Sequence, residues 1–290
     1  MFPLRTLLFT PGDDPRKGEK AFAAGADAVI IDLEDAVAET RKEQARQLAV
    51  QLLSVPRPIP AFVRINGVTS PHILRDLQAV VGLPVAGLML AKAESGEDVG
   101  RVDWLLSLLE QQNGLPPGQI KLIPFIESAR GIARAGEIAA APRVICLAFG
   151  GNDYTMDIGV PYSREGGELF FARNQLVVAS RTAGIAPPLD TVNPDFKDIS
   201  FLMEDARRAR RLGFQGKLVI HPAQVSPVNE IFTPSDEEIA WAQKVVAAFT
   251  RARAAGSGVI QVEGKMVELP IVRRAEQLLA AARRLNKINE

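Results

Sequence analysis

Eight short apolar runs recur along most of the chain, and helix-like segments separate them. Each run is too short for a buried helix, and most are rich in β-branched or aromatic residues, so they predict strands. The segments between them place apolar residues at i, i+3 and i+4 and end near glycine, which is typical of helices. The seventh run is the weakest, because it carries two prolines and an aspartate. The runs cover residues 5–10, 28–33, 61–65, 87–91, 121–126, 144–149, 187–192 and 217–222.

Eight strand–helix units over about 230 residues predict a (β/α)8 barrel, the TIM-barrel fold. The main alternative is a doubly wound open sheet, but the count reaches eight and no G-x-G-x-x-G follows the first strand. We therefore expect a barrel domain over residues 1–232. Residues 233–290 predict two helices joined by a short extended piece. This segment is too small for an independent core, so we expect a C-terminal helical extension that packs on a barrel.

The charge and cysteine content narrow the class of protein. Lysine plus arginine equals aspartate plus glutamate, at 34 each, so no global basic field attracts nucleic acid or an anionic membrane. No apolar stretch is long enough to span a membrane, and the N-terminal segment lacks a secretion signal. The single Cys146 excludes an internal disulfide framework and is expected to be a small buried hydrophobe. We expect a cytoplasmic protein with neither nucleic acid nor a membrane as partner.

Polar side chains gather where the predicted strands end. In a barrel these ends form one mouth, and barrel enzymes do their chemistry there. Any one of these side chains could be a helix cap or part of an ion pair. The whole set indicates a binding or catalytic site, because burying polar groups costs free energy unless they are paired or bind a ligand. Following the runs in order, they are Asp32, Glu34, Asp35, Arg64, Asn66, Lys92, Glu127, Asp153, Asp190 and His221.

Glu127 and Asp153 follow consecutive strands, which are neighbours about 5 Å apart in a barrel. Two bare carboxylates at that distance repel, and a hard divalent cation between them removes the conflict. Oxygen ligands, with water and substrate in the remaining positions, suit Mg²⁺. A zinc site is not expected, because there is one cysteine and the two histidines are far apart in sequence. Arg64 on a nearby strand suits a bidentate grip on a substrate carboxylate.

Six motifs, "LFTPGDD", "AVIIDLEDAV", "FVRING", "IPFIES", "AFGGNDYTMDIG" and "GKLVIHPAQV", together cover nearly the whole chain. In this order they closely resemble the citrate lyase beta subunit (CitE-like) group of the HpcH/HpaI aldolase superfamily, with its citryl-, malyl- and citramalyl-coenzyme A lyases. The resemblance implies Mg²⁺-dependent carbon–carbon cleavage of a 3-hydroxyacyl-coenzyme A. The products would be acetyl-coenzyme A, or a homologue, and a 2-oxo acid. The family's metal ligands fall on Glu127 and Asp153, and its substrate-binding arginine falls on Arg64.

The resemblance also implies a homo-oligomer, a trimer or hexamer, whose C-terminal segment forms a lid near a neighbouring subunit's mouth. In several family lyases the lid carries a catalytic aspartate in a D-G-K-M-like turn, and "VEGKMVELP" places Glu263 there. We expect Glu263 to act as acid or base near the thioester. Glu34 or Asp35 would orient a water or Arg64, or else would only close the mouth with hydrogen bonds.

Coenzyme A carries phosphates, so basic residues near the rim are candidate contacts. Arg16, Lys17 and Lys92 are expected in this role, with a solvated helix face as the alternative for the lysines. Arg5 begins the first strand and could as easily pair with an acid. These contacts follow from the resemblance to coenzyme A lyases.

Two other functions stay open. An aldolase on free 2-oxo acids such as pyruvate would share the metal pair but need no coenzyme A pocket. A non-autonomous citrate lyase subunit would work in a complex with an acyl-carrier partner. The C-terminal lid and the "IHPAQ" segment favour the coenzyme A lyase over the aldolase.

Overall fold

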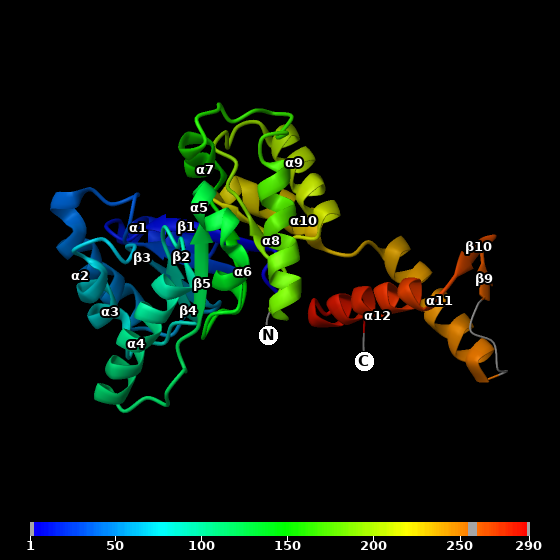
Figure 1. The fold of residues 1–290 in the computed structure, drawn as a ribbon, viewed down its shortest axis with the longest axis horizontal. Coiled ribbons are helices and arrows are strands. Elements are labelled where there is room, and N and C mark those ends of the chain that lie inside the picture. The colour runs from blue at the N-terminus through cyan, green and yellow to red at the C-terminus, as the bar shows by residue number, and fades with distance from the viewer. Residues whose placement is uncertain (1–2, 255–259, 289–290) are drawn as a thin grey trace. The chain divides into compact units, whose positions relative to one another are not determined.

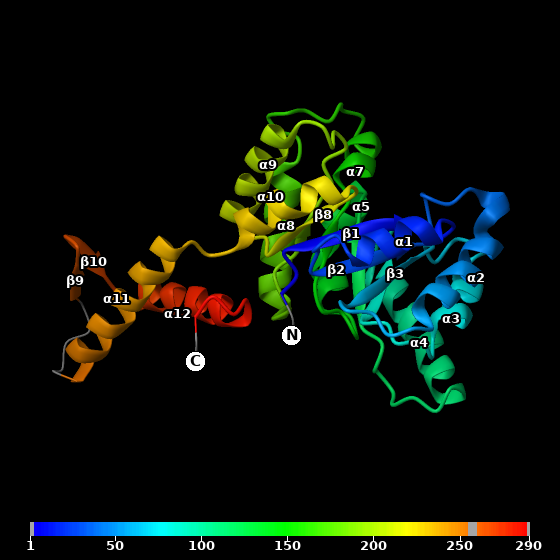
Figure 2. The same ribbon diagram turned by 180° about the vertical axis from the view of Figure 1, so that it is seen from behind.

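The computed structural model describes residues 3–254 and 260–288. The chain divides into two compact units, one from Leu4 to Phe232 and a second that starts at Thr233. In the first unit eight parallel strands close into a barrel, each pairing with the next along the chain and the last with the first (Figures 1 and 2). They are β1 (Thr6–Pro11), β2 (Ala28–Asp32), β3 (Ala61–Ile65), β4 (Gly87–Leu90), β5 (Leu122–Ile126), β6 (Ala148–Phe149), β7 (Leu189–Asp190) and β8 (Gly216–Val219).

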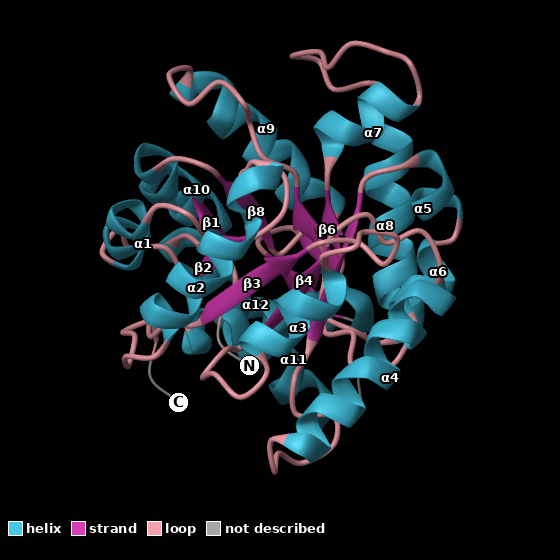
Figure 3. Cartoon of the chain, turned by 90° about the vertical axis from the view of Figure 1, so that its left-hand side faces the viewer, coloured by secondary structure: helices cyan, strands magenta, loops and turns pink. Residues whose placement is uncertain are grey.

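Helices of the same unit surround the strands (Figure 3). The predicted (β/α)8 barrel is therefore confirmed, and each of the eight predicted runs overlaps one of its strands. The helices are α1 (Pro15–Phe22), η1 (Glu39–Arg41), α2 (Lys42–Leu53), α3 (Ile73–Val80), α4 (Gly96–Gln112), α5 (Ala129–Ala133), α6 (Ala135–Ala139), α7 (Gly151–Asp157), α8 (Phe170–Ala183), α9 (Ile199–Leu212), η2 (Pro222–Gln224) and α10 (Val225–Phe232).

Local sequence explains where several helices begin and end. Side-chain oxygens of Asp14, Ser95 and Ser128 accept the backbone N–H groups of residues three positions later, at 3.1, 3.2 and 3.1 Å. These caps satisfy N–H groups that have no partner inside the helix. At the other end, Gly184 and Gly213 stop α8 and α9 in the left-handed conformation, with φ of 71° and 109°. Ser95 and Ser128 thus begin two helices immediately beyond the barrel mouth.

The strands are buried on both faces, so the barrel unit has two apolar layers. One layer lies between the strands and the surrounding helices. The other fills the barrel interior and includes Cys146, which is free and fully buried as predicted. The interior residues are Leu4, Leu7, Ala28, Ile30, Phe62, Met89, Ile123, Phe125, Cys146, Ala148, Leu189 and Leu218.

The second unit consists of α11 (Asp236–Ala254), β9 (Ile260–Val262), β10 (Lys265–Val267) and α12 (Leu269–Arg284). It has an apolar cluster of its own, although its small size led us to expect none; the cluster includes Val245, Phe249 and Leu279. Strands β9 and β10 form an antiparallel hairpin. Its turn residues Glu263 and Gly264 both have positive φ, 50° and 78°, as the tightest hairpin turn requires.

Within the described ranges, 3–254 and 260–288, none of the helices combines the length and the apolar character needed to cross a bilayer.

Candidate active site

The carboxyl ends of β2 to β6 bring the predicted polar residues to one mouth. Asp32 ends β2, Arg64 lies near the end of β3, and Lys92 follows β4 by two positions. Glu127 comes directly after β5. Asp153 lies in the first turn of α7, three residues beyond the glycine that precedes this helix. Glu127 and Asp153 line one cavity of about 460 Å³ that also reaches Lys92.

Arg64 is held in the mouth by two acids. Its Nε and Nη2 donate to the two carboxylate oxygens of Asp32, at 2.7 and 2.5 Å, and its Nη1 lies 3.2 Å from Glu34 Oε2. The guanidinium carbon lies 5.0 Å from the ring centre of Phe9 and 5.7 Å from that of Phe125. Burial alone would lower the pKa of Arg64, but Asp32 and Glu34 outweigh it and raise the pKa. Arg64 is therefore a fixed, permanent cation whose Nε–Nη2 edge is already occupied by protein.

Asp32 organises the loop after β2 as well as Arg64. Its carboxylate accepts the backbone N–H groups of Glu34 at 2.8 Å and Ala36 at 3.1 Å. The side chain is almost completely buried, so these bonds and the arginine satisfy its charge. Asp32 thus fixes both the arginine and the segment that carries Glu34 and Asp35.

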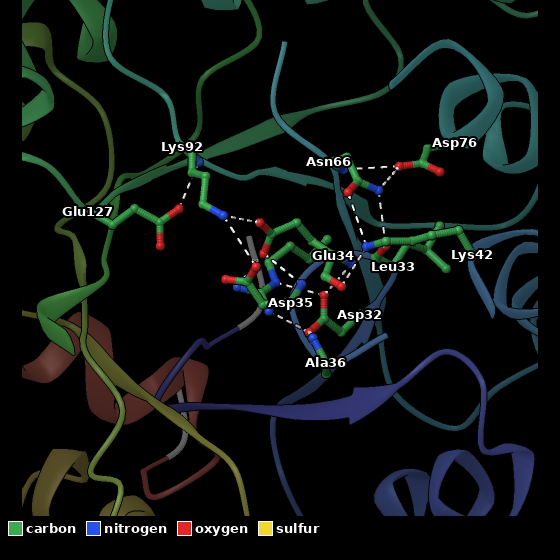
Figure 4. Close-up of polar contacts among 11 residues, drawn as sticks. Asp32, Leu33, Glu34, Asp35, Ala36, Lys42, Asn66, Asp76, Lys92 and Glu127 are labelled. Carbon is green, nitrogen blue, oxygen red and sulfur yellow. Dashed lines mark hydrogen bonds and ion pairs between the residues drawn. The ribbon is translucent and has the colours of Figure 1, made fainter. Parts of the chain in front are cut away.

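Lys92 contacts both sides of the mouth, as Figure 4 shows. Its backbone N–H donates to Glu127 Oε1 at 2.7 Å. Its ammonium donates to Glu34 Oε1 at 2.6 Å and to Asp35 Oδ1 at 3.2 Å. Burial lowers the pKa of Lys92, but Glu34 outweighs this effect and the net pKa is raised. The predicted role in binding coenzyme A phosphates stays a prediction, and here the ammonium faces two acids of the same mouth.

The two carboxylate oxygens of Glu127 differ in their contacts. Oε1 accepts the Lys92 N–H, whereas Oε2 is buried and has no hydrogen-bond partner among the described residues. Burial raises the pKa of Glu127 to about 8; Asp153 raises it too, while Arg64 and the Lys92 N–H act in the opposite direction. A bare, ionised carboxylate is therefore unfavourable at this position. A cation at Oε2 would remove the penalty.

The donor set fits a hard divalent cation. Glu127 and Asp153 supply carboxylate oxygens on the same cavity, and Mg²⁺ commonly takes one or two protein carboxylates with water and substrate. In the ranges that the structure covers, no group of three or more His, Cys, Asp or Glu side chains is arranged to hold a metal. That Glu127 and Asp153 hold a cation together stays a prediction.

The other predicted residues lie in different places. Arg16 and Lys17 are exposed on α1, outside the residues that line the 460 Å³ cavity, and Lys17 lies 3.6 Å from Asp14. Arg5 pairs with Asp27 at 2.6 Å, the alternative that the sequence left open. Glu263 lies in the hairpin turn of the second unit, where Lys244 donates to it at 2.7 Å.

The prediction that Asp190 belongs to the mouth was wrong. Strand β7 directs Leu189 into the barrel interior, and Asp190 therefore faces the surrounding helices. There it accepts hydrogen bonds from Arg173 at 2.9 Å and from Lys217 at 2.6 Å, and all three side chains are fully buried. Strand β7 has only two residues, so an error of one position in the predicted strand assigns each side chain to the wrong face of the sheet.

Sequence reasoning missed a buried network behind the β2 loop. The Lys42 ammonium donates to the backbone oxygens of Leu33 and Glu34, at 2.8 and 2.7 Å, and to Asn66 Oδ1 at 3.2 Å (Figure 4). Asn66 in turn donates to Asp76 at 2.6 Å. Lys42 stands in a charged helical segment and resembles a solvated lysine, so no local signal marked it.

A closed parallel barrel whose mouth gathers a buried arginine and several carboxylates has the architecture of a barrel enzyme. The chain belongs to the HpcH/HpaI aldolase/citrate lyase family, whose family model matches residues 5–222. A second model, that of a C–C bond lyase of the TIM-barrel fold, matches residues 176–284. The protein is accordingly a carbon–carbon lyase.

Known relatives match almost the whole chain. The citrate lyase subunit beta of Leuconostoc mesenteroides is 37% identical, over 96% of this chain and 93% of that protein. The human mitochondrial citramalyl-CoA lyase is 32% identical, over 97% of this chain and 86% of that protein. Among solved structures, Mycobacterium tuberculosis CitE in complex with magnesium, acetoacetate and coenzyme A is 34% identical. It superposes with a TM-score of 0.81, over 97% of this chain and 98% of that one.

Proposed function

We propose that this protein is a Mg²⁺-dependent lyase that cleaves the carbon–carbon bond of a 3-hydroxyacyl-coenzyme A. The substrate would be citryl-, malyl- or citramalyl-coenzyme A, and the products acetyl-coenzyme A or a homologue and a 2-oxo acid. The observation that carries the proposal is the buried Oε2 of Glu127, which has no hydrogen-bond partner within the described ranges, in the cavity that Asp153 also lines. The similar M. tuberculosis CitE, described in complex with magnesium and coenzyme A, supports it.

Glu127 and Asp153 would hold Mg²⁺, which would supply Lewis-acid chemistry to the 2-oxo-acid half of the substrate. Arg64 would offset the negative charge on the same half. Asp32 occupies the Nε–Nη2 edge of the guanidinium, so Nη1 is the nitrogen proposed to face the substrate. Glu34, 3.2 Å from Nη1, and Asp35, which shares Lys92 with it, would orient Arg64 or a water.

The reaction needs two proton transfers. A proton leaves the 3-hydroxyl group as the bond between C2 and C3 breaks and the carbonyl group of the 2-oxo acid forms. The electron pair of that bond passes to the thioester half as an enolate, and protonation of the enolate carbon gives acetyl-coenzyme A. We propose Glu263 of a neighbouring copy as the acid or base near the thioester, within a cytoplasmic trimer or hexamer. Arg16, Lys17 and Lys92 are the proposed contacts to the coenzyme A phosphates.

A second function is supported by the relatives themselves. Citrate lyase subunit beta of L. mesenteroides matches the chain nearly from end to end, and its name describes one subunit of an assembly. The chain would then act on a thioester carried by an acyl-carrier partner. Such a subunit would leave free 3-hydroxyacyl-coenzyme A substrates intact when purified alone.

A panel of coenzyme A thioesters, assayed with the purified protein and Mg²⁺, tests the proposal. We expect cleavage of at least one of the citryl, malyl and citramalyl thioesters. Glu127→Ala or Asp153→Ala should lower kcat about a hundredfold or more, because each removes a ligand of a cation that stabilises charge in the transition state. Glu97→Ala is the control, since this exposed acid lines the same cavity and should leave kcat within about twofold of wild type.

Two results would separate the alternatives. Full activity in excess EDTA, or in either ligand variant, would contradict the metal site. Inactivity toward every free thioester, followed by activity once citrate lyase partner subunits are added, would favour the subunit function instead.

A further inference from the structure

Helix α7, which carries Asp153, begins without a cap of its own. Its N-cap residue is Gly150, which has no side chain to accept a hydrogen bond. Instead the N–H of Gly151, the first helical residue, donates to Thr191 Oγ1 at 2.8 Å. Thr191 follows β7, so a neighbouring strand provides the acceptor that Ser, Thr or Asp usually supplies at the N-cap. Asp153 lies two residues further along this first turn.

The contact between Gly151 and Thr191 is tight. A Cβ atom on Gly151 would lie 3.0 Å from Thr191 Oγ1 and 3.1 Å from its Cγ2. On the other side, a Cβ atom on Gly150 would lie 2.6 Å from the Cβ atom of Glu127. The start of α7 is therefore fixed between the metal ligand Glu127 and the hydroxyl of Thr191.

Thr191 directly follows Asp190, which buried charges hold in place. Arg173 donates to Asp190 with Nε and Nη2, both at 2.9 Å, and Lys217 donates to it at 2.6 Å. The same two cations also bind Asp205, at 2.8 and 2.6 Å. These four side chains come from α8, β7, α9 and β8 and are at most 1% exposed. The end of β7 is thus clamped to two helices and the next strand.

We infer that Thr191 is a positioning residue for the metal ligand Asp153. Its hydroxyl fixes the first turn of α7 so that Asp153 lines the same cavity as Glu127, whose Oε2 has no hydrogen-bond partner in the described part of the chain. The inference rests on the proposed metal site but not on the identity of the thioester. Mutation of a group that orients a metal ligand typically lowers metal affinity 10- to 100-fold.

Mn²⁺ titration of the purified chain, followed by electron paramagnetic resonance of the free ion, tests this role without any substrate. Thr191→Val removes the acceptor at nearly constant volume, and we expect the Kd for Mn²⁺ to rise about 10- to 100-fold. Thr191→Ser keeps the hydroxyl and should stay within about threefold of wild type. Thr155→Val is the matched control, because Thr155 is a buried threonine of α7 whose hydroxyl donates within the helix, to Asn152 O at 2.8 Å. It should change the Kd by less than about threefold.

The outcomes are distinct. Wild-type Kd in Thr191→Val, or an equal loss in Thr155→Val, would overturn the positioning role and leave the proposed function standing. Absence of Mn²⁺ binding by the wild-type chain would overturn the metal site and the inference with it. Mn²⁺ binding that depends on Thr191, in a protein that cleaves none of the thioesters, would support the inference and contradict only the proposed substrate.

If Thr191→Val does not fold, Gly151→Ala provides a second test. The added methyl group must displace Thr191 by a few tenths of an ångström while the hydroxyl is kept. We expect weaker Mn²⁺ binding from this variant as well. A wild-type Kd in folded Gly151→Ala would contradict the inference.

Discussion

Lys92 joins the two halves of the mouth through a backbone conformation that few side chains adopt. Its φ is 53°, in the left-handed region, where an L residue pays about 1 kcal/mol that glycine does not. The contacts to Glu127, Glu34 and Asp35 hold it there. Backbone strain of this kind concentrates at functional sites, because surrounding contacts must compensate for it.

This geometry predicts an unusual order of stability for two variants. Lys92→Ala and Lys92→Gly both lose the ion pairs to Glu34 and Asp35, but only glycine relieves the left-handed backbone. We expect Lys92→Gly to be the more stable of the two by about 1 kcal/mol, measured by urea denaturation at pH 7. Equal stability, or a more stable alanine variant, would show that Lys92 does not hold this conformation in solution. Lys121→Gly and Lys121→Ala form the control pair, at an exposed lysine before β5.

Single residues show how far the sequence could predict the site. The regular strand spacing placed Glu127, Asp153 and Arg64 at one mouth, and the structure brings them there. The pairing of Arg64 with Asp32 could not be predicted, because it depends on side-chain directions across two strands. The left-handed backbone at Lys92 could not be predicted from the sequence either, because lysine does not favour this conformation.

At the scale of elements, four buried charges join β7 and β8 to α8 and α9. Burial by itself raises the pKa of Asp205, but Lys217 and Arg173 outweigh it and lower the pKa from 3.8 to about 2. Because the folded-state pKa lies below the unfolded value, Asp205 contributes stability that is present above pH 3.8. That contribution is lost as the pH falls from 3.8 toward 2.

Asp205→Asn tests this connection between elements. We expect the free energy of unfolding at pH 7 to fall by about 3–5 kcal/mol, because two buried cations are left with one carboxylate. Between pH 4 and about 2 the variant should also lose stability less steeply than wild type. Glu204→Gln, an exposed neighbour in α9, is the control and should change stability by less than about 1 kcal/mol. Urea denaturation across this pH range makes the comparison, and an Asp205→Asn variant as stable as wild type would refute it.

The existence of the strands could be predicted from the apolar runs. The direction of their side chains was harder to predict where a strand has only two residues. The runs that became β1 to β6 and β8 were clear from their composition, and only the seventh run was weak. Strands β6 and β7 contain only two residues each, so neighbouring strands rather than local propensity define them. This explains why the seventh strand was found but the direction of Asp190 was not.

At the scale of the whole molecule, the chain combines a barrel unit and a smaller helical unit that carries Glu263. The hairpin turn presents Glu263 at a positive φ, beside Lys244, on a unit with its own apolar cluster. Because Glu263 lies on a unit separate from the barrel, its carboxylate could act as acid or base in the site of a second copy. This is the arrangement that we propose for the oligomer.

Mixing two inactive variants tests whether the site is shared between copies. Glu263→Ala should lower kcat about 10²- to 10⁴-fold if the residue transfers a proton, and Arg64→Ala should also inactivate the protein. In randomly mixed oligomers, a site built from one copy's Arg64 and its neighbour's Glu263 is intact in roughly a quarter of cases. Co-refolding the two variants should therefore restore roughly a quarter of wild-type kcat, since each intact site works independently. Arg64→Ala mixed with Glu127→Ala is the control: both residues belong to one barrel, so no mixed site is complete and activity should stay absent. If the first mixture also stays inactive while the wild-type protein cleaves its thioester, Glu263 does not act in a neighbouring copy.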